Sequence, residues 1–565
     1  MRTTDKTGVA IFIDQCVQHG MRHVVCSPGS RNAPLVIAID EHPLISTIVI
    51  HDERVAAFYA LGMAQQLNAP VGVVCTSGSA MLNYYPAVAE AYYQCVPLVV
   101  MTADRPEEWI DHGDGQTIVQ KGVYTNHCRF QGAIEEFASS ASEIEKLTSL
   151  VAEAFDLGSG NWKGPMHFNV PVSEPLYASI ERSSFPEKEE ASSDLAGHNF
   201  SNEEVKELSS TWSSSKRKMI LCGQITQGEV LLDLLTEMGN DTSVVVMVEN
   251  TSNLVHSSFI HCIDRTLSSI NDDEIEAFKP EILITIGGAI ISKRIKKFLR
   301  DSSRTVHWRV GFEFPEMDTY RALSKSFECS PATFFKALLP TLNDRNNSMF
   351  GAKWKQKDFF MRDQVKPFMQ TVPYSDLQVF ETILDYIPEG SVLHMGNSSV
   401  VRYCQLFDPV KSILHQSNRG TSGIDGCTST ACGAALADPN RCHVLITGDV
   451  SFFYDSNALW SNHLPSNLRI VLVNNSGGGI FRIIDGPEST GQLEKYFEAQ
   501  HDFSAEHICK AFNVGYVLAQ SNEEIEGEME QFYTENERPK LIEIMTPSTI
   551  NAKVLKEFFQ QAKMS

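Results

Sequence analysis

The stretch GDVSFFYDSNAL, residues 448–459, decides how the C-terminal third of the chain is built. It follows HVLIT at residues 443–447, an uninterrupted apolar run that predicts a buried strand. A second run, RIVLVNN at residues 469–475, ends in two asparagines. Buried strands separated by helical segments indicate a parallel sheet with both faces covered. Ligands bind beyond the carboxyl ends of such strands, so Asp449 is poorly placed for packing but well placed to hold a ligand.

Oxygen-bearing groups follow both of these strands. Neighbouring parallel strands end side by side, which would bring Asp449 and Asn475 together with a free backbone carbonyl at Gly477. Such oxygens suit Mg²⁺, which keeps further positions for water and phosphate oxygens. A helix beginning near Asp455 would offer its first amides to an anion. The alternative, a helix cap and a turn, explains each element singly but not their placement on adjacent strands. The pattern therefore predicts a metal-bridged diphosphate.

Similar runs divide the chain into three α/β units, each with the alternation that predicts a doubly wound parallel sheet. We expect an N-terminal unit over residues 1–182, a central unit over 200–342 and a C-terminal unit over 372–565. A polar linker at 181–200 and a helical connection at 343–375 would separate them. The predicted strands lie at residues 22–27, 46–52, 71–77, 97–104, 218–223, 243–249, 281–288, 304–310, 391–398, 412–420, 443–449, 469–475 and 540–546.

The composition excludes several classes of protein. A chain of 565 residues exceeds what one hydrophobic core organises, which implies two to four domains. The net charge of −23 argues against a nucleic-acid partner and requires local cations at any site for an anion. Thirteen cysteines without a C-x-x-C pair indicate reduced thiols and a cytoplasmic address. The N-terminus is expected to form an amphipathic helix rather than a signal peptide, and the longest apolar runs are too short to span a bilayer.

Taken together, GDVSFFYDSNAL and VNNSGGGIF resemble the diphosphate and metal motif of thiamine-diphosphate enzymes. The resemblance implies thiamine diphosphate as cofactor, and Mg²⁺ or Mn²⁺ held by Asp449, Asn475 and Gly477. It also implies a Glu on another domain whose carboxylate binds the aminopyrimidine ring, and HDERVAAFYALGMA at residues 51–64 supplies Glu53. A carboxyl buried there could share a proton with the ring and so promote loss of the thiazolium C2 proton. The alternative is that Glu53 has no role at a cofactor and stands at the start of a helix because the helix dipole favours a negative charge there.

The finer resemblance is to the 2-succinyl-5-enolpyruvyl-6-hydroxy-3-cyclohexene-1-carboxylate synthases of menaquinone biosynthesis. It covers nearly the whole chain and rests on SPGSRNAPL, TSGSAMLNYYPAVAEA, TADRPEE, GNSSVVR and SNRGTSGIDG, together with the two motifs above. The family decarboxylates 2-oxoglutarate and adds the resulting succinyl carbanion equivalent to isochorismate. In the superfamily the ring-binding Glu and the metal motif meet across a subunit interface, so the resemblance implies a homodimer or homotetramer.

The resemblance assigns site residues that suit two polyanionic substrates. Guanidinium groups bind carboxylates in a bidentate fork, and four arginines on strand-end loops favour that role over surface ion pairs. The residues implied at the substrates and the reaction are Glu53, Gln116, Arg31, Arg105, Ser398, Arg402, Arg419 and Lys293. Those implied at the cofactor are Glu53, Ser30, Ile424, Gly448, Asp449, Val450, Ser451, Asn475, Gly477, Gly478, Ile480 and Phe481. Ile424 is expected beneath the thiazolium.

Two departures from the family pattern and two rival functions stand beside this interpretation. Gly115 takes the place of a usual Asn, which removes one polar contact, and the loop at residues 483–497 differs in composition.

One rival function is another decarboxylase or carboligase of the same superfamily, although its small neutral acceptors would not need the arginines. The other is a non-catalytic subunit, which would have little reason to keep Glu53, Asp449 and Asn475 together. Nucleotide binding by the central unit has only weak glycine-rich support.

Overall fold

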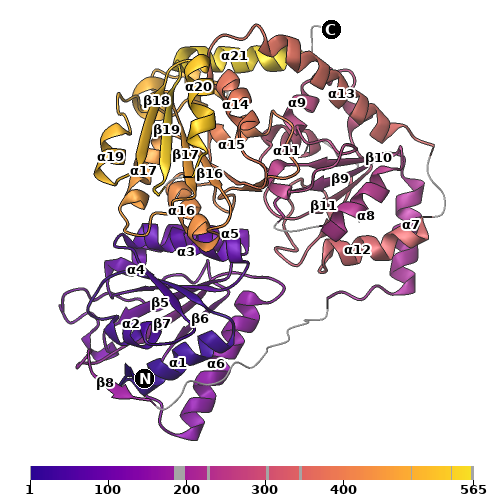
Figure 1. Ribbon diagram of the computed structural model, residues 1–565. Helices are drawn as coiled ribbons and strands as arrows, with labels where there is room; N and C mark the ends of the chain where they lie inside the picture. Colours follow the sequence, from indigo (N-terminus) through magenta and orange to yellow (C-terminus); the bar gives the residue numbers. More distant parts are fainter. Residues whose placement is uncertain are drawn as a thin grey trace.

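The computed structural model describes residues 2–182, 197–225, 229–300, 305–342, 347–484, 486–535 and 537–561. Its strands form three parallel sheets with helices on both faces, so the predicted fold class of three doubly wound α/β domains is confirmed (Figure 1). The predicted linker at 181–200 lies mostly outside the described residues. Among the described helices, none has both the length and the apolar character that crossing a bilayer demands.

The N-terminal domain contains a six-stranded sheet in the order β3-β2-β4-β5-β7-β6, with every pair parallel. A two-stranded antiparallel ribbon of β1 and β8 lies beside it. Its elements are β1 (Arg2–Thr4), α1 (Thr7–Gln18), β2 (His23–Cys26), α2 (Ala33–Asp40), β3 (Ser46–Val49), α3 (Glu53–Leu67), β4 (Val71–Cys75), α4 (Ser79–Asn83), α5 (Tyr85–Gln94), β5 (Leu98–Asp104), the 3₁₀ turn η1 (Glu107–Trp109), β6 (Phe130–Ala133), α6 (Ala141–Ser159), β7 (Met166–Pro171) and β8 (Ser179–Glu181).

The central domain has a five-stranded parallel sheet in the order β10-β9-β11-β12-β13. Its elements are α7 (Asn202–Ser214), β9 (Lys218–Cys222), α8 (Glu229–Gly239), β10 (Val244–Val248), η2 (Asn250–Ser252), α9 (Ile263–Leu267), α10 (Ile275–Phe278), β11 (Ile282–Ile286), α11 (Lys293–Arg300), β12 (Val306–Val310), β13 (Leu323–Phe327), α12 (Pro331–Leu338), η3 (Leu339–Thr341) and the connecting helix α13 (Phe350–Met369).

The C-terminal domain repeats the strand order of the first, as β15-β14-β16-β17-β19-β18. Its elements are α14 (Asp376–Asp385), β14 (Val392–Met395), α15 (Ser399–Cys404), β15 (Leu414–Gln416), α16 (Cys427–Ala437), β16 (His443–Gly448), α17 (Asp449–Tyr454), η4 (Ser456–Leu459), β17 (Leu468–Asn474), α18 (Ile480–Ile483), η5 (Pro487–Ser489), the π-helix η6 (Leu493–Glu498), α19 (Glu506–Ala511), β18 (Gly515–Ala519), α20 (Asn522–Phe532), β19 (Lys540–Met545) and α21 (Ser548–Gln560).

In each sheet the strand order reverses next to the first strand, which creates the crevice where open α/β sheets bind ligands. The reversal falls between β2 and β4, between β9 and β11, and between β14 and β16. Each motif singled out in the sequence begins at the carboxyl end of a strand beside one of these reversals, or at the end of the neighbouring strand in the sheet.

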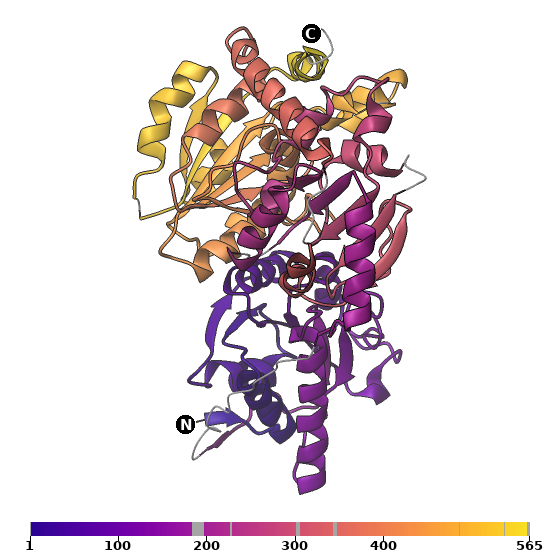
Figure 2. The same cartoon turned by 90° about the vertical axis from the view of Figure 1, so that its right-hand side faces the viewer.

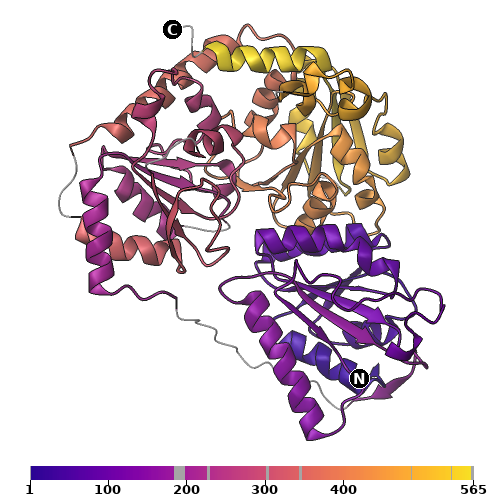
Figure 3. The ribbon, with the colours of Figure 1, turned by 180° about the vertical axis from the view of Figure 1, so that it is seen from behind.

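The two outer domains pack through α3 and α16, which run against each other in two opposite views (Figures 1 and 3). Glycines permit this approach: a Cβ on Gly62 would collide with the carbonyl of Thr430, and one on Gly433 with the carbonyl of Tyr59. Figure 2 shows the N-terminal domain below the other two, with α6 extending away from them. The contact therefore fixes α3, and Glu53 at its first turn, relative to the C-terminal sheet.

One local expectation is wrong and another is confirmed. The helix expected near Asp455 begins at Asp449, because Gly448 already adopts the extended backbone of a residue that precedes a helix, and 456–459 form only a 3₁₀ turn. The amphipathic helix expected at the N-terminus does form as α1, but Arg2–Thr4 before it is a strand paired with β8.

Candidate active site

The ends of β16 and β17 form the first half of the site. The two strands are adjacent and parallel, with Gly448 opposite Val473, as the opening motif predicts. Asp449 is 3% exposed. Its Oδ1 accepts a hydrogen bond from Val450 N at 2.7 Å, and its Oδ2 accepts one from Gly477 N at 2.8 Å. One buried carboxylate therefore ties the two strand ends together.

Asn475 supplies an unused buried oxygen beside that carboxylate. Its Nδ2 donates to Asp376 Oδ2 at 3.1 Å, which turns Oδ1 away, and Oδ1 has no hydrogen-bond partner among the described residues. The Gly477 carbonyl accepts one hydrogen bond, from Gly479 N at 2.9 Å, and retains a second lone pair. A buried polar atom without a partner is costly, so the arrangement fits a cation that Asn475 Oδ1 would coordinate.

Asp376, which sequence reasoning missed, holds Asn475 in this orientation. Burial raises the pKa of Asp376 to about 6, although hydrogen bonds from Thr546 and Asn475 oppose the shift. Thr546 Oγ1 donates to Asp376 Oδ1 at 2.6 Å, and the Asp376 amide donates to Asn551 Oδ1 at 2.9 Å. Asp376 begins the helix α14, seventy-odd residues before the metal motif, and no local sequence pattern marks its role.

The loop at residues 476–479 and the start of α18 are held in place by Glu498, which comes later in the chain. Gly478 N donates to the carbonyl of Glu498 at 2.6 Å, and the buried Glu498 side chain pairs with Arg482. Ile480 and Phe481 are half-buried on α18, and the Phe481 ring lies 5.8 Å from that of Phe497. Asp449, Asn475 and Gly477 form a corner that we call the diphosphate corner. Both predicted apolar residues thus lie at the edge of this corner, where they can face a ligand.

Ile424 belongs to the same corner. It lies in the loop between β15 and α16, is half-buried, and its carbonyl accepts a hydrogen bond from Ser451 Oγ at 3.0 Å. Ser451 is in the first turn of α17, so this bond connects the loop of Ile424 with Asp449. Val450 donates its backbone N–H to Asp449, and Ser451 provides this link to Ile424.

Glu53 is the first residue of α3, after the cap residue Asp52, whose side chain accepts from Val55 N. The expectation of a buried carboxyl is not met in a single chain, where Glu53 is half-buried. Among the described residues no hydrogen bond or ion pair joins Glu53 to Asp449 or Asn475. In a single chain this carboxylate is therefore partly accessible and makes no direct contact with Asp449 or Asn475 among the described residues.

The second half of the opening stretch connects domains. Asp455 is fully buried and pairs with Arg54 at 3.0 Å, while Asn457 Nδ2 donates to Asp52 Oδ2 at 2.9 Å. These contacts hold the residues on both sides of Glu53. Asn457 is therefore a domain contact, which explains its position eight residues after Asp449 without reference to a ligand.

The predicted arginines fall into two groups, and the first lies on the N-terminal domain. Arg31 is 2% exposed and donates to the carbonyl of Val172 at 3.0 Å. Arg105 donates to the carbonyl of Gly115 at 3.2 Å, and both guanidinium groups lie 5.9 Å from the ring of Trp109. Gln116 is exposed with a left-handed backbone, φ 58°, and Ser30 is also exposed. These four predicted residues surround one strand-end surface.

The second group lies where the central and C-terminal domains meet. Arg419 Nη1 donates to Asn397 Oδ1 at 2.6 Å, and Arg402 donates to the carbonyl of Ser398, the cap residue of α15. Burial lowers the pKa of Arg419, while the nearby charge of Glu249 opposes that change and Arg402 adds to it. No hydrogen bond or ion pair among the described residues connects this group with Arg31 or Arg105.

A second lysine of α11, Lys296, lies near this group in addition to the predicted Lys293. Lys293 is the first residue of α11 and is exposed, and among the described residues no hydrogen bond or ion pair joins it to the arginines. Burial lowers the pKa of Lys296, opposed by Glu249 and reinforced by Arg419 and Arg402. Glu249 itself accepts backbone hydrogen bonds from Ile291 and Ser292, just before α11. The role expected for Lys293 stays a prediction, and Lys296 is a further cation on the same helix.

A cavity of about 440 Å³ opens beside Arg419. It lies between the carboxyl ends of the central sheet and the N-terminal domain, and its lining includes Gln94, Gln224, Gly287 and Arg309. The Gln224 side chain crosses this boundary, donating to Gln94 Oε1 at 2.9 Å. The second cation group thus borders solvent-accessible space inside a single chain.

Family models cover most of the chain and define its class. The N-terminal thiamine pyrophosphate (TPP) binding domain of thiamine pyrophosphate enzymes matches residues 6–123, the middle domain of these proteins matches 196–395, and their C-terminal TPP binding domain matches 395–544. The fold, the diphosphate corner and these matches make the chain a thiamine pyrophosphate enzyme.

Curated relatives narrow the class. Three proteins named 2-succinyl-5-enolpyruvyl-6-hydroxy-3-cyclohexene-1-carboxylate synthase are similar over nearly their whole length. The one from Flavobacterium johnsoniae is 43% identical and covers 97% of this chain and 98% of its own. Those from Christiangramia forsetii and Desulfotalea psychrophila are 44% and 37% identical, covering 97% and 96% of this chain and 97% and 99% of their own. The chain belongs to the 2-succinyl-5-enolpyruvyl-6-hydroxy-3-cyclohexene-1-carboxylate synthase family.

Proposed function

We propose that this enzyme decarboxylates 2-oxoglutarate and adds the succinyl unit to isochorismate, a step of menaquinone biosynthesis. The observation that carries the proposal is the joint presence of a diphosphate corner and a set of strand-end cations in a chain of net charge −23. Cations gathered against that overall field are expected where two carboxylate-rich substrates bind. A carboligase with small neutral acceptors would not need them.

We assign the metal to Asp449, Asn475 Oδ1 and the Gly477 carbonyl, with Mg²⁺ or Mn²⁺ as the ion. Among the described residues no three His, Cys, Asp or Glu side chains are arranged so that they could hold a metal ion, so a cation here relies on amide and carbonyl oxygens besides Asp449. When bound, thiamine diphosphate supplies an electron sink for the loss of CO₂ from a 2-oxo acid. The Gly448–Ser451 turn and the Gly477–Gly478 loop would enclose its diphosphate.

The protein's own contribution to the reaction is orientation and charge. Arg31 and Arg105 on one surface, and Arg402 and Arg419 on the other, would bind substrate carboxylates in bidentate fashion. Lys296 adds a cation beside the second pair. Ile480 and Phe481 at the edge of the corner would exclude water, which would otherwise protonate the succinyl carbanion equivalent before it reached isochorismate.

Glu53 would exchange a proton with the aminopyrimidine ring, and this requires a second chain. In one chain Glu53 is half-buried and makes no direct contact with Asp449 or Asn475. No hydrogen bond or ion pair among the described residues connects the two groups of arginines. Nearby apolar side chains are unusually exposed: Val49 by 46%, Tyr454 by 59% and Trp460 by 49%. We infer a homodimer, or a tetramer of two such dimers, in which the N-terminal domain of one subunit completes the C-terminal site of its partner.

Two further assignments belong to the proposal. All thirteen cysteines are free, which supports a reducing, cytoplasmic location. We place the domain boundaries at residues 1–182, 200–342 and 372–565, because each range contains one of the three sheets, while the connecting helix α13 lies between the second and third ranges.

The proposal is tested by incubating purified protein with thiamine diphosphate, Mg²⁺, 2-oxoglutarate and isochorismate, and following isochorismate loss and product mass. We expect both substrates to be consumed together with release of CO₂. Release of CO₂ without an adduct would indicate a different decarboxylase. Calorimetric binding of the cofactor without any turnover would indicate a non-catalytic subunit.

A further inference from the structure

The short helix α15 carries two predicted substrate residues but is too short to hold its own position. It has six residues, with Ser398 as its cap residue and Arg402 in its last turn. Isolated helices of this length are unstable in water, so neighbouring elements must fix the helix. The segment that follows it, residues 404–408, is held by the central domain at two points.

The first point is the buried side chain of Asn250, which follows β10. Asn250 is 5% exposed, and its Nδ2 donates to the carbonyl of Cys404 at 2.9 Å. Cys404 is the last residue of α15, and its carbonyl is one of the helix-end acceptors without a partner inside the helix. The backbone N–H of Asn250 also donates to Gln405 Oε1 at 3.3 Å. The central domain therefore caps the C-terminus of α15.

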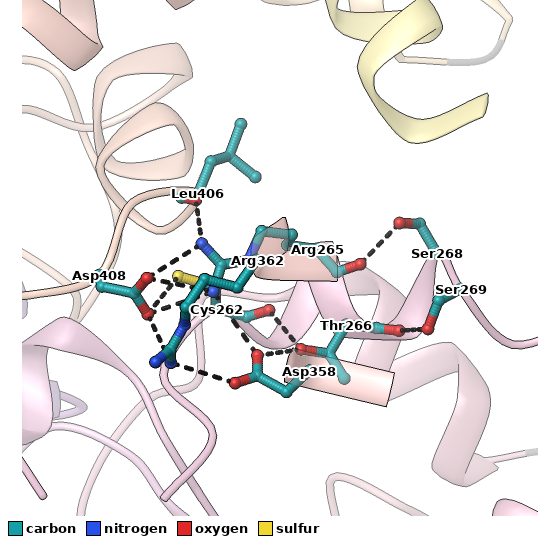
Figure 4. Close-up of polar contacts among 9 residues, drawn as sticks. All are labelled: Cys262, Arg265, Thr266, Ser268, Ser269, Asp358, Arg362, Leu406 and Asp408. Carbon is teal, nitrogen blue, oxygen red and sulfur yellow. Dashed lines mark hydrogen bonds and ion pairs between the residues drawn. The ribbon is translucent and has the colours of Figure 1, made fainter. Parts of the chain in front are cut away.

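The second point is Arg265 on α9, drawn with its partners in Figure 4. Arg265 is 2% exposed; its Nη1 donates to the carbonyl of Leu406 at 3.2 Å, and its Nη2 to Asp408 Oδ1 at 3.1 Å. Asp358 lies 3.6 Å from Arg265, and Arg362 reaches both Asp358 and Asp408 at 3.2 Å. The helix α9 of the central domain and the connecting helix α13 thus hold the end of one loop.

The carboxylate of Asp264, the neighbour of Arg265 on α9, lies near enough to Arg402 for its charge to act on the guanidinium. Burial lowers the pKa of Arg402, and the charge of Asp264 opposes that change. Asp264 is itself held by Ser292, which donates to it just before α11. Adjacent residues of one short helix therefore attract the Arg402 guanidinium and anchor the segment that follows its helix.

We propose that Asn250 and Arg265 are positioning residues for Arg402. They act across the boundary between the central and C-terminal domains and touch neither substrate nor cofactor. The inference rests on the proposed function, in which Arg402 binds a substrate carboxylate. Bidentate binding of a carboxylate requires a defined guanidinium orientation, so a small rotation of α15 would weaken it.

The test variant is Arg265→Lys, which keeps the charge but cannot reach the Leu406 carbonyl and both oxygens of Asp408 together. Its matched control is Arg182→Lys, since Arg182 forms a bidentate pair with the buried Asp14 in the N-terminal domain. We expect Arg265→Lys to raise the KM of at least one substrate about tenfold with kcat little changed, and the control to leave both unchanged. Cofactor affinity by calorimetry should stay at the parent value in both variants.

Two measurements separate positioning from a general loss of structure. Amide hydrogen exchange in residues 399–408 should become faster in Arg265→Lys, and in Asn250→Ala, which serves if Arg265→Lys folds poorly. In an Arg402→Ala background, Arg265→Lys should have little further effect on KM, because the residue through which it acts is gone. Unchanged KM and exchange in an active Arg265→Lys enzyme would overturn the inference. An inactive parent would instead count against the proposed function.

Discussion

Replacing Gly433 by alanine tests whether the contact between α3 and α16 sets the position of Glu53. The new Cβ would lie under 3.0 Å from the Tyr59 carbonyl, against an ordinary contact of 3.4–4 Å. The obstacle is helix backbone, so the helices would have to separate by roughly 1 Å. Overpacking of this kind costs about 1–3 kcal/mol of unfolding free energy. Because α3 begins at Glu53, the shift should also lower kcat by about 10- to 100-fold.

The assay is chemical unfolding together with steady-state kinetics on the holoenzyme. Gly527→Ala is the matched control, since Gly527 lies inside the helix α20 and its Cβ would meet no atom within 4 Å. That variant should gain roughly 0.5–1 kcal/mol from helix propensity and keep its activity. If Gly433→Ala had the same unfolding free energy as Gly527→Ala and the same kcat as the parent enzyme, the contact between α3 and α16 would not be what positions Glu53.

Three further predictions follow from the site and the core. Glu53→Gln should fold and bind thiamine diphosphate with near-parent affinity in calorimetry while losing nearly all turnover; activity within a few-fold of the parent would contradict its role. Asn475→Ala removes the unused buried oxygen and should weaken Mn²⁺ binding, measured by electron paramagnetic resonance, by tenfold or more, whereas an unchanged affinity would remove Asn475 from the metal site. Burial lowers the pKa of His443 to about 4, so this side chain is neutral when folded and takes up a proton on unfolding. Stability should therefore fall as pH drops from about 6.5 towards 4, and His443→Gln should flatten that slope in thermal unfolding; an equal slope would show that other groups cause it.

The sequence predicted most of the strands that are buried on both faces, because an uninterrupted apolar run is a local pattern. It left out the buried β7, where His167 and Asn169 interrupt the run, and the short ribbon of β1 and β8. It also left out β6, β13 and β18, which lie at open sheet edges and contain polar or exposed residues. An edge strand packs on fewer neighbours, so its sequence does not need the run. The adjacency of Asp449 and Asn475 was predictable, since parallel strands that follow each other often lie side by side.

Other features depended on contacts between distant parts of the chain. Asp376 and Glu249 are single acids that lie far along the chain from the motif residues that they hold or attract. Asn457 belongs to the opening motif, but its side chain contacts Asp52 of the N-terminal domain. Lys296 could have been added to Lys293 only by knowing which face of α11 is turned towards Arg419. Half-burial of Glu53 reflects a surface that one chain does not cover.

Subunit complementation between two inactive variants tests the central claim most directly. Glu53→Gln and Asp449→Asn chains, carrying different tags, would be co-expressed and the mixed dimer assayed beside each parent variant. If each site combines the N-terminal domain of one subunit with the C-terminal domain of its partner, the mixed dimer contains one intact site and should show about half the parent activity. A mixed dimer as inactive as either variant alone would show that Glu53 and Asp449 serve the same site from one chain, and would contradict the account.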